Sequence, residues 1–164
     1  MHMKSVKFAA ALLSTMAVGT SAIAAYGPTG TLTISGVVTA VTELEVTAAP
    51  DATTLNILAG ETDKLVASVS ERSNNIGGYK VTLTSVNNGQ LVNGANATLK
   101  TAYKIGYDGG TKLSLTNSAT QVKNVTALTG LTTVASAMRV EVTALPTAAA
   151  GTYSDTITVA ITAN

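Results

Sequence analysis

Two stretches near the ends of the chain alternate between apolar and polar residues. Residues 31–38 read Thr-Leu-Thr-Ile-Ser-Gly-Val-Val, and residues 157–162 read Ile-Thr-Val-Ala-Ile-Thr. Because side chains of a β-strand point alternately to opposite faces, each stretch predicts a strand with one apolar face. In the first stretch that face consists of Leu32, Ile34, Gly36 and Val38. In the second it consists of Ile157, Val159 and Ile161.

The residues between these two stretches also favour strands. Hydrophobic residues make up 46% of the chain but aromatic residues only 4%, and Thr and Val, which favour strands, are abundant. We find no segment with a convincing apolar period of 3.6 residues, although residues 132–137 could hold one helical turn. Short strands separated by turns indicate an all-β fold of the sandwich type.

We expect further strands where alternation recurs between turn residues. The segments are residues 41–47, 54–58, 64–71, 79–85, 90–92, 101–107 and 138–143, with residues 112–115 pairing back against 101–107. Residues 73–78 read Ser-Asn-Asn-Ile-Gly-Gly, a strong turn signal, so the strands before and after them are expected to form a hairpin.

The first 24 residues are predicted to be a signal peptide. Lys4 and Lys7 supply a short positive region, the apolar run 8–18 follows, and Ala22-Ile23-Ala24 has the small residues of a cleavage site. The apolar run is about half of the roughly 20 residues that a spanning helix needs. We expect cleavage after Ala24 or Ala25 and therefore an exported protein.

Several classes of function are excluded by missing residue types. The chain has no cysteine, which removes disulfides, thiolate metal sites and cysteine nucleophiles. Its one histidine is His2, within the predicted signal peptide, so the exported chain has no histidine for catalysis or metal binding. The net charge of +1 gives no basic patch for nucleic acid. We therefore expect no enzyme, and no catalytic, cofactor-binding or metal-binding residue.

Acidic residues and tyrosines offer weaker functional alternatives. Calcium binding needs more oxygen ligands at tighter spacing than the acidic residues near turns supply, which are Glu61, Asp63 and Glu71. A carboxylate pair at Glu43 and Glu45 could serve glycoside hydrolysis, but a solvent-facing strand explains the pair more simply. A sugar-binding face is conceivable for three tyrosines whose spacing favours the core: Tyr79, Tyr103 and Tyr107.

The apolar strands at the two ends raise the question of what covers them. An exposed apolar edge strand promotes aggregation, and one way to cover it is to exchange a strand with another subunit. The simpler alternative is that residues 31–38 form an ordinary first strand paired within their own chain.

The two end stretches resemble a known family. Residues 30–38, with apolar residues alternating around the central Gly36, resemble the N-terminal donor strand of chaperone–usher pilins. Residues 151–156, Gly-Thr-Tyr-Ser-Asp-Thr, followed by alternation, are similar to the closing strand of archaic chaperone–usher pilins and spore coat protein U-like domains. The absence of cysteine departs from the pilin class whose first strands are joined by a disulfide.

The resemblance implies a fold and a way of assembly. The fold would be an incomplete immunoglobulin-like β-sandwich of six strands plus an N-terminal donor strand. Residues 1–24 would be the signal peptide, 25–38 the donor-strand extension and 39–164 the sandwich domain. Donor residues Leu32, Ile34, Gly36 and Val38 would fill a groove in the next copy, beside its Ile157, Val159 and Ile161.

The implied function is that of a fimbrial structural subunit. The chain would be exported to the periplasm, handed by a periplasmic chaperone to an outer-membrane usher, and polymerised head to tail at the cell surface, where the fibre supports adhesion or biofilm formation. Its partners would be copies of itself, the chaperone and the usher, with no small-molecule substrate. The alternative from another class is a self-complete, secreted β-sandwich that acts as a binding module.

Overall fold

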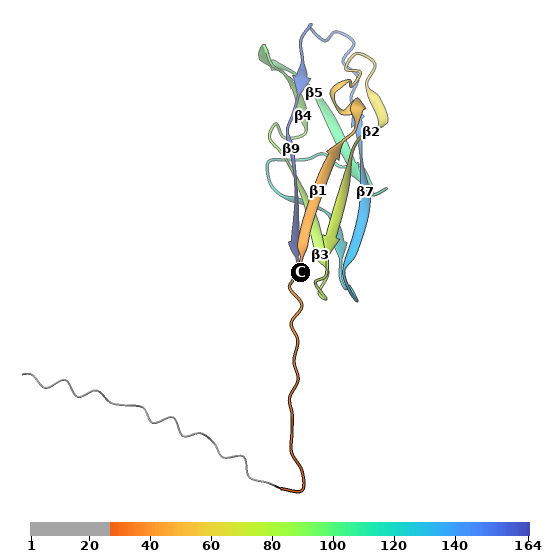
Figure 1. The fold of residues 1–164 in the computed structure, drawn as a ribbon. Helices are drawn as coiled ribbons and strands as arrows, with labels where there is room; N and C mark the ends of the chain where they lie inside the picture. The colour runs from red at the N-terminus through yellow and green to blue at the C-terminus, as the bar shows by residue number, and fades with distance from the viewer. Residues whose placement is uncertain (1–26) are drawn as a thin grey trace, which may run out of the picture. The chain divides into compact units, whose positions relative to one another are not determined.

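Two antiparallel β-sheets face each other in the computed structural model, which describes residues 27–164 (Figure 1). The larger sheet has the order β1 (Thr42–Ala48), β2 (Glu61–Ser73), β7 (Thr132–Val142), β5 (Asn96–Tyr107), β4 (Gln90–Asn93) and β8 (Tyr153–Ser154). The smaller has the order β6 (Thr120–Val125), β3 (Tyr79–Ser85) and β9 (Ile157–Ala163). The predicted all-β, immunoglobulin-like sandwich is confirmed. The predicted number of six strands is wrong, since residues 27–164 form nine strands, in part because the final strand is divided into β8 and β9.

The core lies between the sheets and follows from strand alternation. Every second residue of β3 is buried, and the side chains of Tyr79, Val81 and Leu83 are no more than 1% exposed. From the larger sheet, Val69 of β2, Ile105 of β5 and the inward residues of β7 meet them. The one helix of residues 27–164 is a single 3₁₀ turn, Pro50–Thr53, and no helix in this range is long and apolar enough to cross a membrane.

The hairpin expected between residues 64–71 and 79–85 is wrong. β2 pairs with β1 and β7, whereas β3 pairs with β6 and β9, so the turn carries the chain from one sheet to the other. Gly78 explains why: its φ is 79°, and an added Cβ would lie 1.8 Å from the carbonyl oxygen of Val125. The glycine permits a close crossing beside β6 instead of a tight hairpin.

Residues 54–58 and 132–137 also differ from their predicted structures. Residues 54–58 form no strand; Leu55 and Ile57 are partly buried against the core, and their alternation reflects that packing. Residues 132–137 form the first half of β7, not a helical turn, because β7 lies between β2 and β5 and pairs with both. Leu113 pairs with Ile105 in an isolated bridge, which confirms the predicted return of residues 112–115.

A buried ionic cluster joins the two sheets. The Glu71 carboxylate, fully buried on β2, accepts hydrogen bonds from the hydroxyls of Tyr107 (2.5 Å) and Tyr79 (2.6 Å). Lys123 Nζ, on β6, lies 3.0 Å from Glu71 and 2.7 Å from Asp108. Burial alone would raise the pKa of Glu71, but these hydrogen bonds outweigh it and hold the pKa below its usual value.

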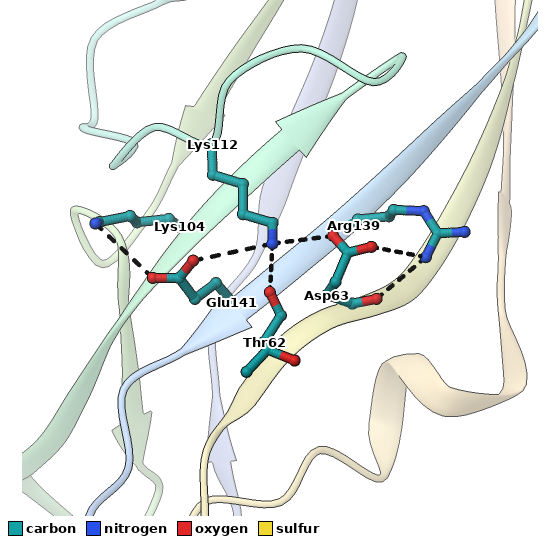
Figure 2. A network of polar contacts seen from close by, with 6 residues as sticks. All are labelled: Thr62, Asp63, Lys104, Lys112, Arg139 and Glu141. Atoms are coloured by element: carbon teal, nitrogen blue, oxygen red, sulfur yellow. Dashed lines mark hydrogen bonds and ion pairs between the residues drawn. The ribbon is translucent and has the colours of Figure 1, made fainter.

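An exposed charge network covers the outer face of the larger sheet (Figure 2). Lys112 Nζ lies 2.9 Å from Asp63 and 3.9 Å from Glu141, and it also donates to the carbonyl oxygen of Thr62. Arg139 pairs with Asp63 at 3.2 Å, and Lys104 with Glu141 at 3.8 Å. Because most of these side chains are exposed and solvent screens their charges, the individual pairs contribute little to stability.

Residues 28–41 form no strand. Leu32, Ile34 and Val38 are 86%, 88% and 86% exposed. The strand predicted over residues 31–38 therefore has no partner strand among the described residues of its own chain. The predicted signal peptide, residues 1–24, lies outside the described residues.

Candidate subunit-interaction groove

β1 and β9 are edge strands of opposite sheets, and they lie side by side (Figure 1). Within residues 27–164, β1 pairs with β2 alone and β9 pairs with β3 alone. Each strand therefore has one edge whose backbone N–H and C=O groups lack a strand partner. Such an edge is a template for another strand.

A groove of about 330 Å³ opens between these two edges. Val46 and Ala48 of β1 form one wall, and Ile157 and Val159 of β9 form the other. Its floor is the core itself, reached through a set of apolar side chains: Leu91, Tyr103, Ile105, Met138 and Val140. Val46 is 46% exposed, so an apolar side chain of β1 meets water at this opening. The groove suits an extended segment with apolar side chains at alternate positions.

A second hollow continues the groove. It has a volume of about 400 Å³ and shares four lining residues with the groove: Ala52, Leu55, Leu91 and Asp155. Its remaining lining comes from Thr53, Ile57 and residues 151–154. The open channel therefore runs beyond the start of β9, between the 3₁₀ turn region and the β8 segment.

Asp155 fixes the end of the groove at which β9 begins. Its Oδ2 accepts hydrogen bonds from Ser85 Oγ (2.5 Å) and Tyr103 OH (2.6 Å). Its Oδ1 accepts from the backbone N–H groups of Asn87 (2.9 Å) and Thr156 (2.7 Å). Burial, together with the hydrogen bond to Asp155, raises the pKa of Tyr103, which stays a neutral donor.

Asp155 also explains why the predicted final strand is divided. Residues 153–154 form β8 and pair with β4 of the larger sheet, whereas residues 157–163 form β9 and pair with β3 of the smaller sheet. The chain changes sheets at Asp155 and Thr156, where the carboxylate holds the backbone. This change of sheet places β9 at the edge of the groove.

The predicted residues of the last strand are only partly assembled at the groove. Ile157 and Val159 line it, while Ile161 packs against the core beside Val81, its register partner on β3. Gly36 has nothing within 4 Å of an added Cβ. The donor role of residues 31–38 and the acceptor role of β9 stay predictions.

Sequence reasoning missed the opposite wall and the floor. Val46 alternates with Glu45 and Thr47, a signal from which this wall could have been found, whereas Ala48 lies beyond the predicted segment 41–47. The floor could not be found in this way, because Leu91, Tyr103 and Met138 are buried core residues, and their sequence pattern does not show that a groove reaches them. Only the order of strands in both sheets shows which part of the core is uncovered.

The weaker candidates of the sequence do not form sites. Glu43 and Glu45 lie on the exposed face of β1, and Glu43 pairs with Arg72 at 2.7 Å. Glu71 is buried in the core while Asp63 pairs with Lys112 and Arg139 outside it, and the described residues hold no group of three possible metal ligands. The three tyrosines are core residues, 1–3% exposed: Tyr79, Tyr103 and Tyr107.

Comparison with known proteins finds similar solved structures but no similar sequence. No family model matches the chain, and no curated protein matches its sequence. Among solved structures, the chain is similar to the CooA pilin subunit from enterotoxigenic Escherichia coli, with 10% sequence identity and a TM-score of 0.40. The likeness covers 74% of this chain and 89% of that one. The function proposed below therefore rests on this chain's own groove and residues.

Proposed function

We propose that this chain is an exported structural subunit of a surface fibre, polymerised by donor-strand exchange. The observation that carries the proposal is the apolar groove between the unpaired edges of β1 and β9. Residues 31–38 of a second copy would fill it. The route that the pilin resemblance implies, by a periplasmic chaperone and an outer-membrane usher to a fimbria that supports adhesion or biofilm formation, belongs to the same proposal.

The donor segment and β9, which forms one wall of the groove, agree in length. Residues 31–38 would span about 26 Å as a strand, and β9 spans about 23 Å. The side chains of Leu32, Ile34 and Val38 would point to the floor of the groove. Gly36, which has no side chain, would let the backbone approach closely at one point. The donor backbone would pair with the free edge of β9, as in other cases of strand addition.

The energy of this contact is large enough for a lasting joint. Burying a Leu, Ile or Val side chain contributes roughly 1.5–3 kcal/mol, so the three donor residues contribute roughly 5–9 kcal/mol. Backbone hydrogen bonds add to this, and the cost of ordering the segment reduces it. The contact is heterologous, since the donor segment and groove are different surfaces, and a heterologous contact that does not close builds a filament.

The alternative, a self-complete binding module, is supported less well. A complete sandwich closes over its core on all sides, whereas here an apolar groove between β1 and β9 reaches down to core residues. Residues 31–38, which would have to be its first strand, are exposed and belong to no strand.

The test compares residues 25–164 with a chain that begins at Thr39. Both are run on size-exclusion chromatography and, without boiling, on SDS-PAGE. We expect the longer chain to form an SDS-resistant ladder, and the shorter chain to stay monomeric and to unfold at lower temperature. Adding a synthetic peptide of residues 26–40 is expected to raise the unfolding temperature of the shorter chain. If both chains are stable monomers that ignore the peptide, the proposal is wrong.

A further inference from the structure

Asn74 holds the segment that connects the donor residues to the sandwich. Its backbone N–H donates to the carbonyl oxygen of Val41 at 3.1 Å, and its Oδ1 accepts from the backbone N–H of Val41 at 2.7 Å. Its Nδ2 donates to the carbonyl oxygen of Thr39 at 2.8 Å. These three hydrogen bonds begin directly beyond the last pair of the β1–β2 ladder, Thr42 with Ser73. They continue the ladder over residues 39–41 and keep that segment in line with β1.

Without such a restraint, the chain's own donor segment would be a strong competitor for its groove. Residues 39–41 are long enough to serve as a hairpin loop, since loops of about three residues are common. In the register that places Val38 opposite Thr42, Ile34 would lie opposite Val46, and Leu32 opposite Ala48. Val46 and Ala48 form the β1 wall of the groove, so this register pairs apolar residues with apolar residues.

Effective concentration makes this competition severe. A segment joined by a short linker reaches its site at an effective concentration of the order of millimolar, provided the linker can span the distance. A second copy at micromolar concentration would lose to it by a factor of about 1,000. Polymerisation therefore requires that residues 39–41 be prevented from turning.

We propose that Asn74 prevents the donor segment from entering its own groove and so directs it to a second copy of the chain. A turn at residues 39–41 would break the three hydrogen bonds to Asn74. This inference rests on the proposed function, because it assumes that residues 31–38 fill a groove. It makes Asn74 a positioning residue for assembly: it touches neither the groove nor the donor face, yet it decides between intramolecular and intermolecular filling.

The test compares Asn74→Ala with Asn75→Ala in residues 25–164. Asn75 lies in the same turn, but its side chain binds the carbonyl oxygens of Gly78 (3.0 Å) and Asn164 (3.3 Å) instead of residues 39–41. For Asn74→Ala we expect ladder formation at micromolar concentration to slow about tenfold or more. Monomers should accumulate whose residues 31–38 resist limited proteolysis, because the segment now fills its own groove. Asn75→Ala should polymerise at the wild-type rate.

A second variant tests the same inference without altering Asn74. Inserting Gly-Ser-Gly-Ser between Val38 and Thr39 supplies a turn outside the restrained segment, and we expect a protease-resistant, self-filled monomer. If Asn74→Ala and the insertion both polymerise like the wild type, Asn74 has no such role, while the proposed function stands. If the wild type itself forms no ladder and ignores the donor peptide, the proposed function fails instead.

Discussion

At the scale of single residues, the Glu71 side chain joins the two sheets through polar contacts. It is fully buried and holds Tyr79, Tyr107 and Lys123 from three different strands or their ends. We expect Glu71→Gln to lower the free energy of unfolding by about 3 kcal/mol, since it leaves the partly buried Lys123 with Asp108 as its one carboxylate. Urea denaturation measures this. The matched control Glu43→Gln removes an exposed ion pair and should cost less than about 1 kcal/mol.

Glu71 also predicts how stability depends on pH. Its pKa in the folded chain lies below the ordinary value of 4.5. The ionised carboxylate therefore stabilises the fold fully above about pH 4.5, and this contribution is lost as the pH falls through the lower, folded-state pKa. Thermal unfolding between pH 3 and 7 should show a steeper acid loss for the wild type than for Glu71→Gln. Equal slopes would mean that other carboxylates cause the acid loss.

Asp155 is a second polar residue on which stability is expected to depend, and it lies at the end of the groove where β9 begins. Asp155→Ala removes the acceptor of four hydrogen bonds. The hydroxyls of Ser85 and Tyr103, which are buried residues, then lose this acceptor. We expect a loss of about 2–4 kcal/mol in the free energy of unfolding and weaker binding of the donor peptide, since β9 is no longer fixed. Asp51→Ala, which breaks an exposed pair with Lys64, should leave both nearly unchanged.

At the scale of elements, the two faces of residues 31–38 give a direct test of the donor strand. Ile34→Asp places a charge on the face that would enter the groove, and burying it there without a partner costs several kcal/mol. We expect this variant to form no SDS-resistant ladder. Val37 would point to the opposite face of the strand, away from the groove. The Val37→Asp variant carries the same charge there and should still polymerise. Loss of the ladder in both variants would contradict the predicted face.

The strands also show what alternation of apolar and polar residues predicts and what it does not. It located β1, β3, β5 and β9 because each has one face on the core and one toward solvent. It could not assign partners, so residues 64–71 and 79–85 were expected in one hairpin although Gly78 sends the chain to the other sheet. The sequence predicts Ile157 and Val159 beside the groove. It does not predict the floor, because the floor depends on the order of strands in the sheets, which pairs residues far apart in the chain.

At the scale of the whole molecule, the absence of cysteine leaves the sandwich dependent on packing and on the Glu71 cluster. The open groove interrupts that packing, because core residues such as Ile105 and Val140 line it. Under the proposed strand exchange, a second copy completes each subunit, so assembly of the fibre stabilises the fold. We therefore expect the unfolding temperature of the chain to rise with its concentration.

Two variants that cannot polymerise alone should form one donor–groove contact when they are mixed. Ile34→Asp disables the donor segment but keeps the groove, and Val159→Asp disables the groove but keeps the donor segment. Because the proposed contact is heterologous, the donor segment of the Val159→Asp chain would fill the groove of the Ile34→Asp chain, and nothing would remain to extend the pair. Each variant alone should stay monomeric, and the mixture should give an SDS-resistant dimer with no larger species. A ladder in the mixture, or no dimer, would contradict donor-strand exchange through this groove.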